Sequence, residues 1–288
     1  IDKRVAVKVL RHEVAADEEL VSRFVTEARA VNAIEHQNII DVFAFGRLPD
    51  GRAYYIMEYL RGHSLEELLE CGDEIPPEDI IDILKQVADA VDAAHERHII
   101  HRDLKPDNIY LVPRRSGETR AVVLDFGIAK LGHGPHRTRS GLVMGTPLYM
   151  SPEQCRGIEL DHRTDVYALG TIAYRMLAGR LPFEADSVQV VMYQQISRAA
   201  TPPSDFGAPP SVDGVLMKAL AKDLQYRFHS MSELVEALEQ ALLYPDAQPL
   251  PHVGVVQHEV DAWCEITKPV DMGEVRAKGK GRPRRSSP

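Results

Sequence analysis

Cysteine is scarce in this sequence: Cys71, Cys155 and Cys264 lie far apart, and no two of them form a CxxC pair. This spacing indicates neither a zinc site nor a disulfide framework and is typical of a reducing compartment. The chain also lacks an apolar run close to the length of a membrane span, and its first residues are not a signal peptide. We therefore expect a cytoplasmic protein without a membrane segment. A membrane anchor that lies beyond either end of this sequence is the alternative.

Positive charge is in deficit as well, because 34 Lys and Arg residues stand against 43 Asp and Glu residues, a net charge of −9. That balance argues against a protein body that binds nucleic acid through bulk charge. Gly, Pro and low-complexity sequence are not in excess before the last 50 or so residues. At 288 residues the chain is long enough for one large domain or two lobes around a core.

A polar octet, His101–Asn108, lies between apolar Ile99-Ile100 and Ile109–Leu111. The apolar runs predict short strands, so the octet is expected to form a tight loop over a core. Such a loop gathers a carboxylate, a cation and a side-chain carbonyl. Phosphoryl transfer needs these groups, to receive a hydroxyl proton, to neutralise the migrating phosphate and to hold Mg²⁺. The alternative is a polar loop whose charges merely neutralise one another.

The segment 4–10 alternates and predicts a strand with Ala6 and Lys8 on one face. A lysine on an internal strand face needs a partner. The next helix, predicted over 17–34, carries Glu27 beside its apolar stripe. Glu27 is therefore the expected partner of Lys8, and the alternative is a solvated helix glutamate.

The rest of the chain up to residue 243 reads as further strands and helices. His95, near the end of the first long helix, is expected to be structural. The predicted strands cover 39–46, 53–58, 109–112 and 121–124, the segment 113–120 is a solvent-facing hairpin tip, and helices begin at Ser64, run over 76–97 and close the domain over 211–221 and 230–243.

Four stretches, in order, resemble the motifs of protein kinases: VAVK at Val5–Lys8, the octet His101–Asn108, DFG at Asp125–Gly127 and GTPLYMSPE at Gly145–Glu153. The overall sequence pattern most resembles that of bacterial Ser/Thr kinases of eukaryotic type, over about residues 1–243. The resemblance implies an α+β, bilobal protein-kinase-like fold that uses ATP and Mg²⁺ and acts on Ser and Thr of protein substrates.

The domain organisation follows from the same resemblance. Residues 1–60 would form a small, truncated β-rich N-lobe with one helix and the hinge, and residues 61–244 a mainly helical C-lobe. Residues 245–288 would be a linker and a basic tail.

The resemblance also assigns the catalytic roles. Asp103 would accept the proton of the substrate hydroxyl, and Lys105, two residues later as in Ser/Thr kinases, would neutralise the transferred phosphate. Asn108 and Asp125 would hold Mg²⁺, which prefers hard oxygen ligands. Asp107 lies between the motif positions and is expected to be a solvated or structural carboxylate.

The nucleotide site is implied in the same way. Lys8 would bind the α- and β-phosphates and Glu27 would hold it in place. The adenine pocket would use Ala6 as its ceiling, Tyr110 as its floor, Met57 at its flank and backbone groups of Glu58 and Leu60. For this apolar set the alternative is that its members are simply buried strand residues.

Arg102 predicts regulation, because an arginine next to the catalytic aspartate can bind a phosphorylated loop residue. The candidate phosphosites are Thr138 and Ser140, modified by autophosphorylation in trans between self-associating copies. Thr146 would touch Asp103 and Lys105.

Three further residues are expected to be structural supports. Glu153 would pair with Arg227, and Asp165 would hold the backbone of the catalytic loop.

The match breaks at the start, where only four residues precede Val5 and no glycine-rich phosphate loop is present. The sequence would then be a piece of a longer reading frame or a degenerate kinase, and truncation is favoured because the other catalytic side chains are present. We expect an exposed sheet edge, weak ATP binding and little activity from this chain. A non-catalytic pseudokinase scaffold is the alternative function.

The tail is basic, with six Lys and Arg residues and no acidic residue over 276–288. Lys280–Arg285 resembles an AT-hook, which would lay arginine into an A·T-rich minor groove of DNA. The alternative is a disordered basic tail, with Ser286 and Ser287 as further phosphorylation candidates.

Overall fold

A computed structural model of the chain describes residues 4–10, 21, 22, 26, 29, 32–126 and 147–243. The chain divides into two units, Ile1–Val253 and Gly254–Pro288, and all described residues belong to the first. Several predictions lie outside the described residues: the ones on Glu27, Gly127, Thr138, Ser140 and Thr146, and those on the linker and the basic tail.

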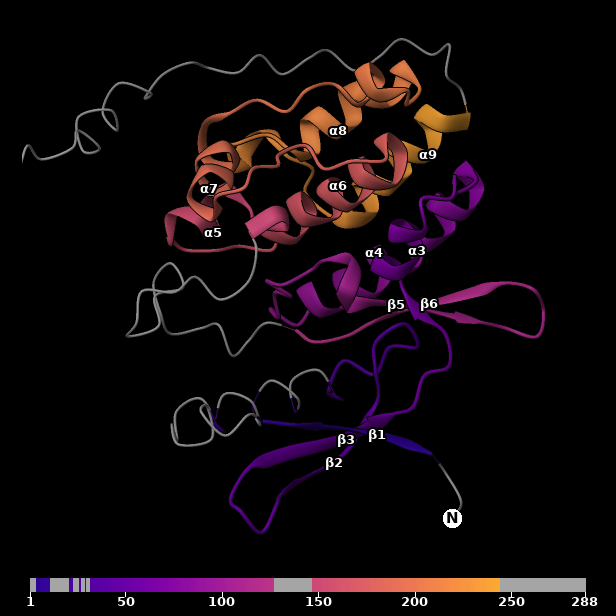
Figure 1. The fold of residues 1–288 in the computed structure, drawn as a ribbon, viewed down its shortest axis with the longest axis vertical. Helices are drawn as coiled ribbons and strands as arrows, with labels where there is room; N and C mark the ends of the chain where they lie inside the picture. Colours follow the sequence, from indigo (N-terminus) through magenta and orange to yellow (C-terminus); the bar gives the residue numbers. More distant parts are fainter. Residues whose placement is uncertain are drawn as a thin grey trace, which may run out of the picture. The chain divides into compact units, whose positions relative to one another are not determined.

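The first sheet consists of β1 (Val5–Val9), β2 (Val42–Arg47) and β3 (Ala53–Glu58), antiparallel in the order β1-β3-β2 (Figure 1). The predicted alternation of β1 is confirmed, since Ala6 and Lys8 are half-buried while the three valines are 37% to 52% exposed. β1 is an edge strand of this described sheet, as expected. Its register places Lys8 opposite Tyr55.

The helix predicted over 17–34 is confirmed at residues 21, 22, 26, 29 and 32, which are helical, whereas residues 33 and 34 form a turn, so the helix ends slightly earlier than predicted. The segment after it is fixed by Asn38, whose side chain is 2% exposed. Its amide Nδ2 donates to the Ala121 carbonyl at 2.7 Å and to Gln86 Oε1 at 2.8 Å. The Asn38 carbonyl accepts the N–H of Val123 at 2.7 Å. Asn38 therefore joins the end of this helix to the second sheet.

The second sheet has the order β4-β5-β6, with β4 at His63–Ser64, β5 at Ile109–Pro113 and β6 at Thr119–Val123. Just before β4, Gly62 packs against β5 so closely that a Cβ atom would lie 1.9 Å from the carbonyl oxygen of Leu111. Only glycine allows this approach. Helix α3 (Leu65–Cys71) follows, and Ser64 and Glu67 form the capping box at its start.

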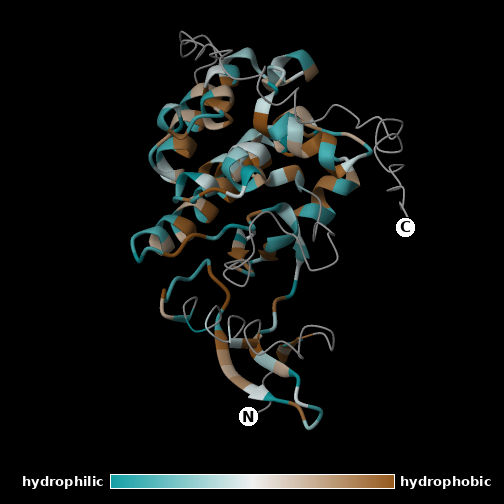
Figure 2. Cartoon of the chain, turned by 90° about the vertical axis from the view of Figure 1, so that its left-hand side faces the viewer, coloured by the Kyte–Doolittle hydropathy of each residue, from teal (hydrophilic) through white to brown (hydrophobic). Residues whose placement is uncertain are grey.

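The remaining described helices build the larger part of the core. Helices α4 and α6 carry fully buried aliphatic side chains such as Leu84, Val87 and Leu169, and each such burial stabilises the fold by roughly 1.5–3 kcal/mol. The helices have apolar and polar sides, as Figure 2 shows. They are α4 (Pro77–His95), α5 (Pro152–Arg156), α6 (Arg163–Ala178), α7 (Val188–Ser197), α8 (Asp213–Ala219) and α9 (Met231–Leu243).

Two sequence predictions are wrong. Ile99-Ile100 is not a strand, because α4 ends in a turn with a left-handed residue at His98 (φ 59°) and the chain passes directly into the loop. Arg120 is not part of a solvent-facing hairpin tip. It lies in β6, and its guanidinium donates to the Gln37 carbonyl at 2.8 Å and to Glu58 at 3.2 Å. The hairpin turn is shorter than predicted because β6 begins at Thr119.

Cys71 and Cys155 are free thiols, and Cys264 lies outside the described residues. Burial raises the pKa of the Cys155 thiol to about 12. Among the helices of the described residues, none combines the length and the apolar character that crossing a membrane requires.

Candidate active site

Asp165, in the first turn of α6, holds the backbone of the octet loop. Its carboxylate accepts the N–H of His101 at 2.8 Å and the N–H of Arg102 at 2.9 Å, and it is fully buried. Burial alone would raise the pKa of Asp165, but the hydrogen bond and the charge of His95 and the N–H of Arg102 lower it. The predicted supporting role of Asp165 is confirmed.

His95 completes this support from α4. Its Nε2 lies 2.7 Å from Asp165 Oδ2, and its Nδ1 lies 3.5 Å from Asp92 Oδ1. Burial favours the neutral ring, but the hydrogen bond with Asp165 and the negative charges of Asp165 and Asp92 outweigh burial and raise the pKa of His95 to about 9. The carboxylate of Asp92 also accepts the N–H groups of Met231 and Ser232. His95 therefore connects the loop to the helical core, as expected of a structural histidine.

His101 organises the loop from within. Its ring is fully buried, its Nε2 lies 3.0 Å from the Leu124 carbonyl, and its Nδ1 accepts the N–H of Asp103 at 3.3 Å. Burial lowers the pKa of His101, which agrees with this neutral tautomer. The ring also packs on Phe126 with centroids 4.5 Å apart. Because Phe126 follows Asp125, this contact joins the segments of both predicted catalytic carboxylates.

Asn108 bonds back to Asp103. Its Nδ2 donates to the Asp103 carbonyl at 2.8 Å and lies 3.5 Å from Asp103 Oδ2. This assigns the amide nitrogen to the loop and leaves the side-chain oxygen as an acceptor. The Asn108 carbonyl accepts the N–H of Leu124, the residue before Asp125, at 2.8 Å. The predicted members Asp103, Asn108 and Asp125 are thus brought to one place.

Lys8 reaches this place from the first sheet. Its Nζ lies 2.5 Å from Asp125 Oδ1, and the same oxygen accepts the hydroxyl of Tyr55 at 3.1 Å. The described partner of Lys8 is therefore Asp125, while Glu27 lies outside the described residues. Asp125 has φ 45°, a left-handed conformation that Asp tolerates better than most residues. Sequence reasoning missed Tyr55, because nothing in its strand pattern shows where its hydroxyl points.

The predicted adenine set is placed on both sheets. Ala6 on β1 lies opposite Met57 on β3, and Tyr110 lies on β5, where its hydroxyl donates to the Gly62 carbonyl at 2.8 Å. The Glu58 side chain pairs with Arg120, and the backbone N–H of Glu58 donates to the Asp41 carbonyl at 2.9 Å.

Leu60 differs from Glu58, because no described residue accepts a hydrogen bond from its backbone N–H.

Lys105 and Asp107 form an ion pair within the octet loop. Lys105 Nζ lies 3.7 Å from Asp107 Oδ2, and the Asp107 side chain is 54% exposed, as expected of a solvated carboxylate.

The Nε of Arg102 is buried, and no described residue accepts a hydrogen bond from it. Burial lowers the pKa of Arg102. A buried N–H of this kind favours an acceptor, so Arg102, whose side chain is partly exposed, remains a candidate phosphate receptor.

Glu153 and Arg227 form the predicted pair between α5 and the segment before α9. The guanidinium donates to both carboxylate oxygens, at 2.7 and 2.8 Å, and Thr164 donates to Glu153 at 2.7 Å. Burial would raise the pKa of Glu153, but Arg227 holds it below its usual value. Beside Glu153, Gln154 Nε2 donates to the Arg102 carbonyl at 2.7 Å, a contact to the loop that sequence reasoning did not find.

The donor set suits Mg²⁺ and a nucleotide rather than a metal held by protein alone. No group of three His, Cys, Asp or Glu side chains gathers at metal-binding distance within the described segments. Asp125 and Asn108 supply oxygens only, and Mg²⁺ is commonly held by one or two carboxylates together with substrate phosphates. These two residues therefore fit the ion that the sequence predicted.

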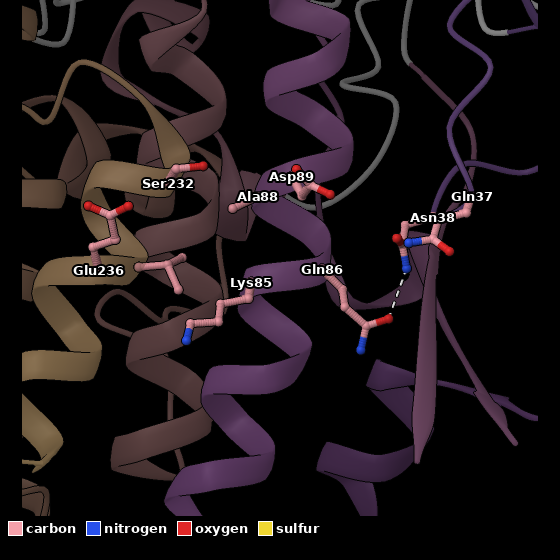
Figure 3. A pocket seen from close by; sticks show the side chains of 9 residues that line it. Gln37, Asn38, Lys85, Gln86, Ala88, Asp89, Ser232 and Glu236 are labelled. Carbon is pink, nitrogen blue, oxygen red and sulfur yellow. Dashed lines mark hydrogen bonds between the residues drawn. The ribbon is translucent and has the colours of Figure 1, made fainter. Parts of the chain in front are cut away.

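A cavity of about 340 Å³ lies elsewhere, between α4, α9 and the segment of Gln37 and Asn38. Figure 3 shows Lys85 and Glu236 on its helical walls and the Asn38 amide bonded to Gln86. None of its lining residues belongs to the predicted catalytic or nucleotide set. Two of its lining residues, Asn38 and Gln86, form the hydrogen bond that joins the segment of Asn38 to α4.

Comparison with known proteins places this geometry in a family. The profile described as "Protein kinase domain" matches residues 1–241, so the chain belongs to the protein kinase family. The α+β fold with a small β-sheet lobe and a helical lobe, predicted from the motifs, is confirmed.

The most similar curated relatives include bacterial Ser/Thr kinases. The chain is 42% identical over 231 residues to "Serine/threonine-protein kinase pkn3" and 44% identical over 246 residues to "Serine/threonine-protein kinase Pkn1", both from Myxococcus xanthus. These alignments cover 77% and 84% of this chain but only 42% and 35% of the relatives. The chain thus spans about two fifths of the length of the curated relatives it matches.

Solved structures agree with the fold. The kinase domain of Mycobacterium tuberculosis PknI superposes with a TM-score of 0.64 at 29% identity, over 83% of this chain and 86% of that one.

Proposed function

We propose that this chain is the catalytic domain of a protein kinase that transfers the γ-phosphate of ATP to Ser and Thr hydroxyls of proteins, in the cytoplasm. The observation that supports it best is the convergence of Lys8, Asp103, Asn108 and Asp125, which come from distant parts of the sequence. The names of its relatives point the same way.

In this mechanism the chain positions reactants and supplies charge. Asp103 accepts the proton of the substrate hydroxyl, and its backbone is fixed by His101 and Asn108. Lys105 neutralises the transferred phosphate, and Lys8 contacts the other phosphates. Mg²⁺, held by Asn108 and Asp125, offsets the phosphate charges when it is bound.

Adenine would lie between Ala6 and Tyr110, flanked by Met57, and would bond backbone groups of Glu58 and Leu60. The N–H of Leu60, which has no acceptor among the described residues, supports this assignment. Glu27 would hold Lys8, as the sequence predicted.

The direct test is phosphotransfer from radiolabelled ATP to a general protein substrate with Asp103→Asn. We expect a loss of at least about 100-fold, since removing a general base costs 10²–10⁴-fold. Asp107→Asn is the matched control, because it makes the same chemical change three residues away on an exposed side chain, and it should keep activity. Equal rates for wild type and Asp103→Asn would contradict the proposal.

The missing glycine-rich loop motivates a second comparison. We expect this chain to transfer phosphate far more slowly than a chain extended upstream to include such a loop. Equal rates would show that the loop matters little here. If both bind ATP analogues but neither transfers phosphate, the pseudokinase scaffold becomes the better reading.

We also propose activation by phosphorylation in the segment that contains Thr138 and Ser140, through trans-autophosphorylation between two copies. The buried Nε of Arg102, which has no acceptor among the described residues, supports this, because a phosphate could bond to it. Phosphopeptide mapping should find Thr138 or Ser140 modified in active protein. Arg102→Ala should remove the stimulation by phosphorylation, whereas exposed Arg97→Ala should not. Active protein without either phosphate would refute the idea.

DNA contact through the basic tail stays a prediction that rests on Lys280–Arg285 alone. Binding to A·T-rich duplexes should weaken with salt and with Arg282→Ala.

A further inference from the structure

Tyr55 places a phenol hydroxyl at the predicted metal ligand. It lies in the middle of β3, opposite Lys8 in the strand register, and is 6% exposed. Its hydroxyl donates to Asp125 Oδ1 at 3.1 Å. A buried tyrosine hydroxyl requires a partner, and a charge-assisted bond to a carboxylate is among the stronger ones.

Lys8 approaches the same oxygen. Its Nζ lies 2.5 Å from Asp125 Oδ1 and 5.8 Å from the centre of the Tyr55 ring. Two donors from neighbouring strands thus converge on one carboxylate oxygen. Among the described residues, none donates a hydrogen bond to the other oxygen, Oδ2.

The backbone conformation of Asp125 explains why the hydrogen bond from Tyr55 matters. Asp125 has φ 45°, a conformation that costs a non-glycine residue free energy and persists only where its surroundings hold it. The Asp125 side chain is also 35% exposed, so packing alone does not fix its rotamer. A donor that does not itself bind phosphate can hold the carboxylate while Lys8 turns to a nucleotide.

We propose that Tyr55 is a positioning residue for Asp125: its hydroxyl holds Oδ1 and thereby directs Oδ2 toward Mg²⁺. This inference rests on the proposed function, in which Asp125 binds the ion. In this role Tyr55 acts through Asp125 and not on the nucleotide or the metal itself. Its contribution is to keep the ligand oriented, which lowers the Mg²⁺ concentration that nucleotide binding needs.

The test is Tyr55→Phe, which removes the hydroxyl and keeps the ring. Binding of a fluorescent ATP analogue is measured in EDTA and then as a function of Mg²⁺, together with the melting temperature. We expect the Mg²⁺ concentration at half-saturation to rise about tenfold, as expected for the loss of one charge-assisted hydrogen bond. Affinity in EDTA should change less than about twofold, because no nucleotide contact is removed.

Tyr54→Phe is the matched control. Tyr54 is the preceding residue of the same strand, its side chain points to the other face, and its ring lies against Gly46. The same hydroxyl deletion there should leave the Mg²⁺ dependence unchanged.

The outcomes separate the two proposals. If wild type binds the analogue with Mg²⁺ and Tyr55→Phe shows the same Mg²⁺ dependence, the role of Tyr55 is refuted while the kinase proposal stands. A parallel loss of affinity in EDTA and in Mg²⁺ would also refute it, since it would reveal a general packing role. If wild type binds no analogue even at saturating Mg²⁺, the proposed function fails, and the role of Tyr55 fails with it.

Discussion

Two ion pairs of nearly equal length have opposite surroundings. Arg227 and Glu153 approach to 2.7 Å with side chains that are 0% and 2% exposed, whereas Lys8 and Asp125 approach to 2.5 Å with side chains that are 40% and 35% exposed. Distance therefore does not distinguish a structural pair from a functional one. Solvation does, because the interaction and the consequence of losing a partner both depend on the local dielectric.

The hydrogen bonds differ in the same sense. Arg227 also donates to the carbonyls of Ala221 and Arg163, and Glu153 also accepts from Thr164, so the buried pair is satisfied on every side. Asp125 keeps one oxygen without a donor among the described residues, and Lys8 faces water. A pair that is closed by its neighbours maintains the fold, and a pair that is open to water can exchange its partner for a ligand.

Arg227→Met should have the largest effect, because it leaves the Glu153 carboxylate buried and unpaired. We expect the free energy of unfolding to fall by about 3–5 kcal/mol, measured by denaturant titration. The control is Arg52→Met, which breaks a 2.7 Å pair with Asp50 whose side chains are 32% and 38% exposed. That change should lower the free energy of unfolding far less, because solvent screens the exposed pair. Similar losses in both variants would mean that burial does not decide the strength of these pairs.

His95 extends the comparison to pH. Its folded pKa of about 9 lies above the ordinary 6.5, so its contribution is complete below pH 6.5 and is lost as the pH rises toward 9. We expect a loss of roughly 3 kcal/mol over that range from the shift. The pKa of Lys222, which burial lowers to about 7, acts in the opposite direction. The measurement is therefore the difference in the free energy of unfolding between wild type and His95→Gln as a function of pH. A difference that does not change with pH would contradict the raised pKa of His95.

The sequence predicted the buried pair and the support from Asp165, because Glu153, Arg227 and Asp165 lie at recognisable motif positions. It also predicted β1, α3 and α4, whose alternation, capping box and Pro-initiated start are local signals. It could not place the hydroxyl of Tyr55 or the amide of Asn38, because their partners are 70 and 83 residues away. Arg120 was misplaced for the same reason, since its partners are Glu58 in the first sheet and the Gln37 carbonyl in a turn, and neither lies in its hairpin.

Asn38→Ala tests a contact between these extremes, a buried polar group without charge. It removes two hydrogen bonds and leaves the Ala121 carbonyl and Gln86 Oε1 without this donor. We expect unfolding free energy to fall by about 1–3 kcal/mol, measured by the same denaturant titration. Exposed Asn32→Ala, from the preceding helix, should change it by less than about 0.5 kcal/mol. A loss as large as that of Arg227→Met would remove the distinction between charged and neutral buried contacts.

Lys8→Met should have the smallest effect on stability and a large effect on function. Because both side chains are more than a third exposed, solvent screens the pair, and we expect the free energy of unfolding to change by less than about 1 kcal/mol. Binding of a fluorescent ATP analogue should weaken at least about tenfold, since a cation that contacts phosphate is lost. If Lys8→Met instead destabilised the fold as Arg227→Met does while leaving nucleotide affinity intact, the open pair would be structural. Asp125, with its left-handed backbone, its bond from Tyr55 and an Oδ2 that no described residue bonds, would then serve the fold rather than a ligand.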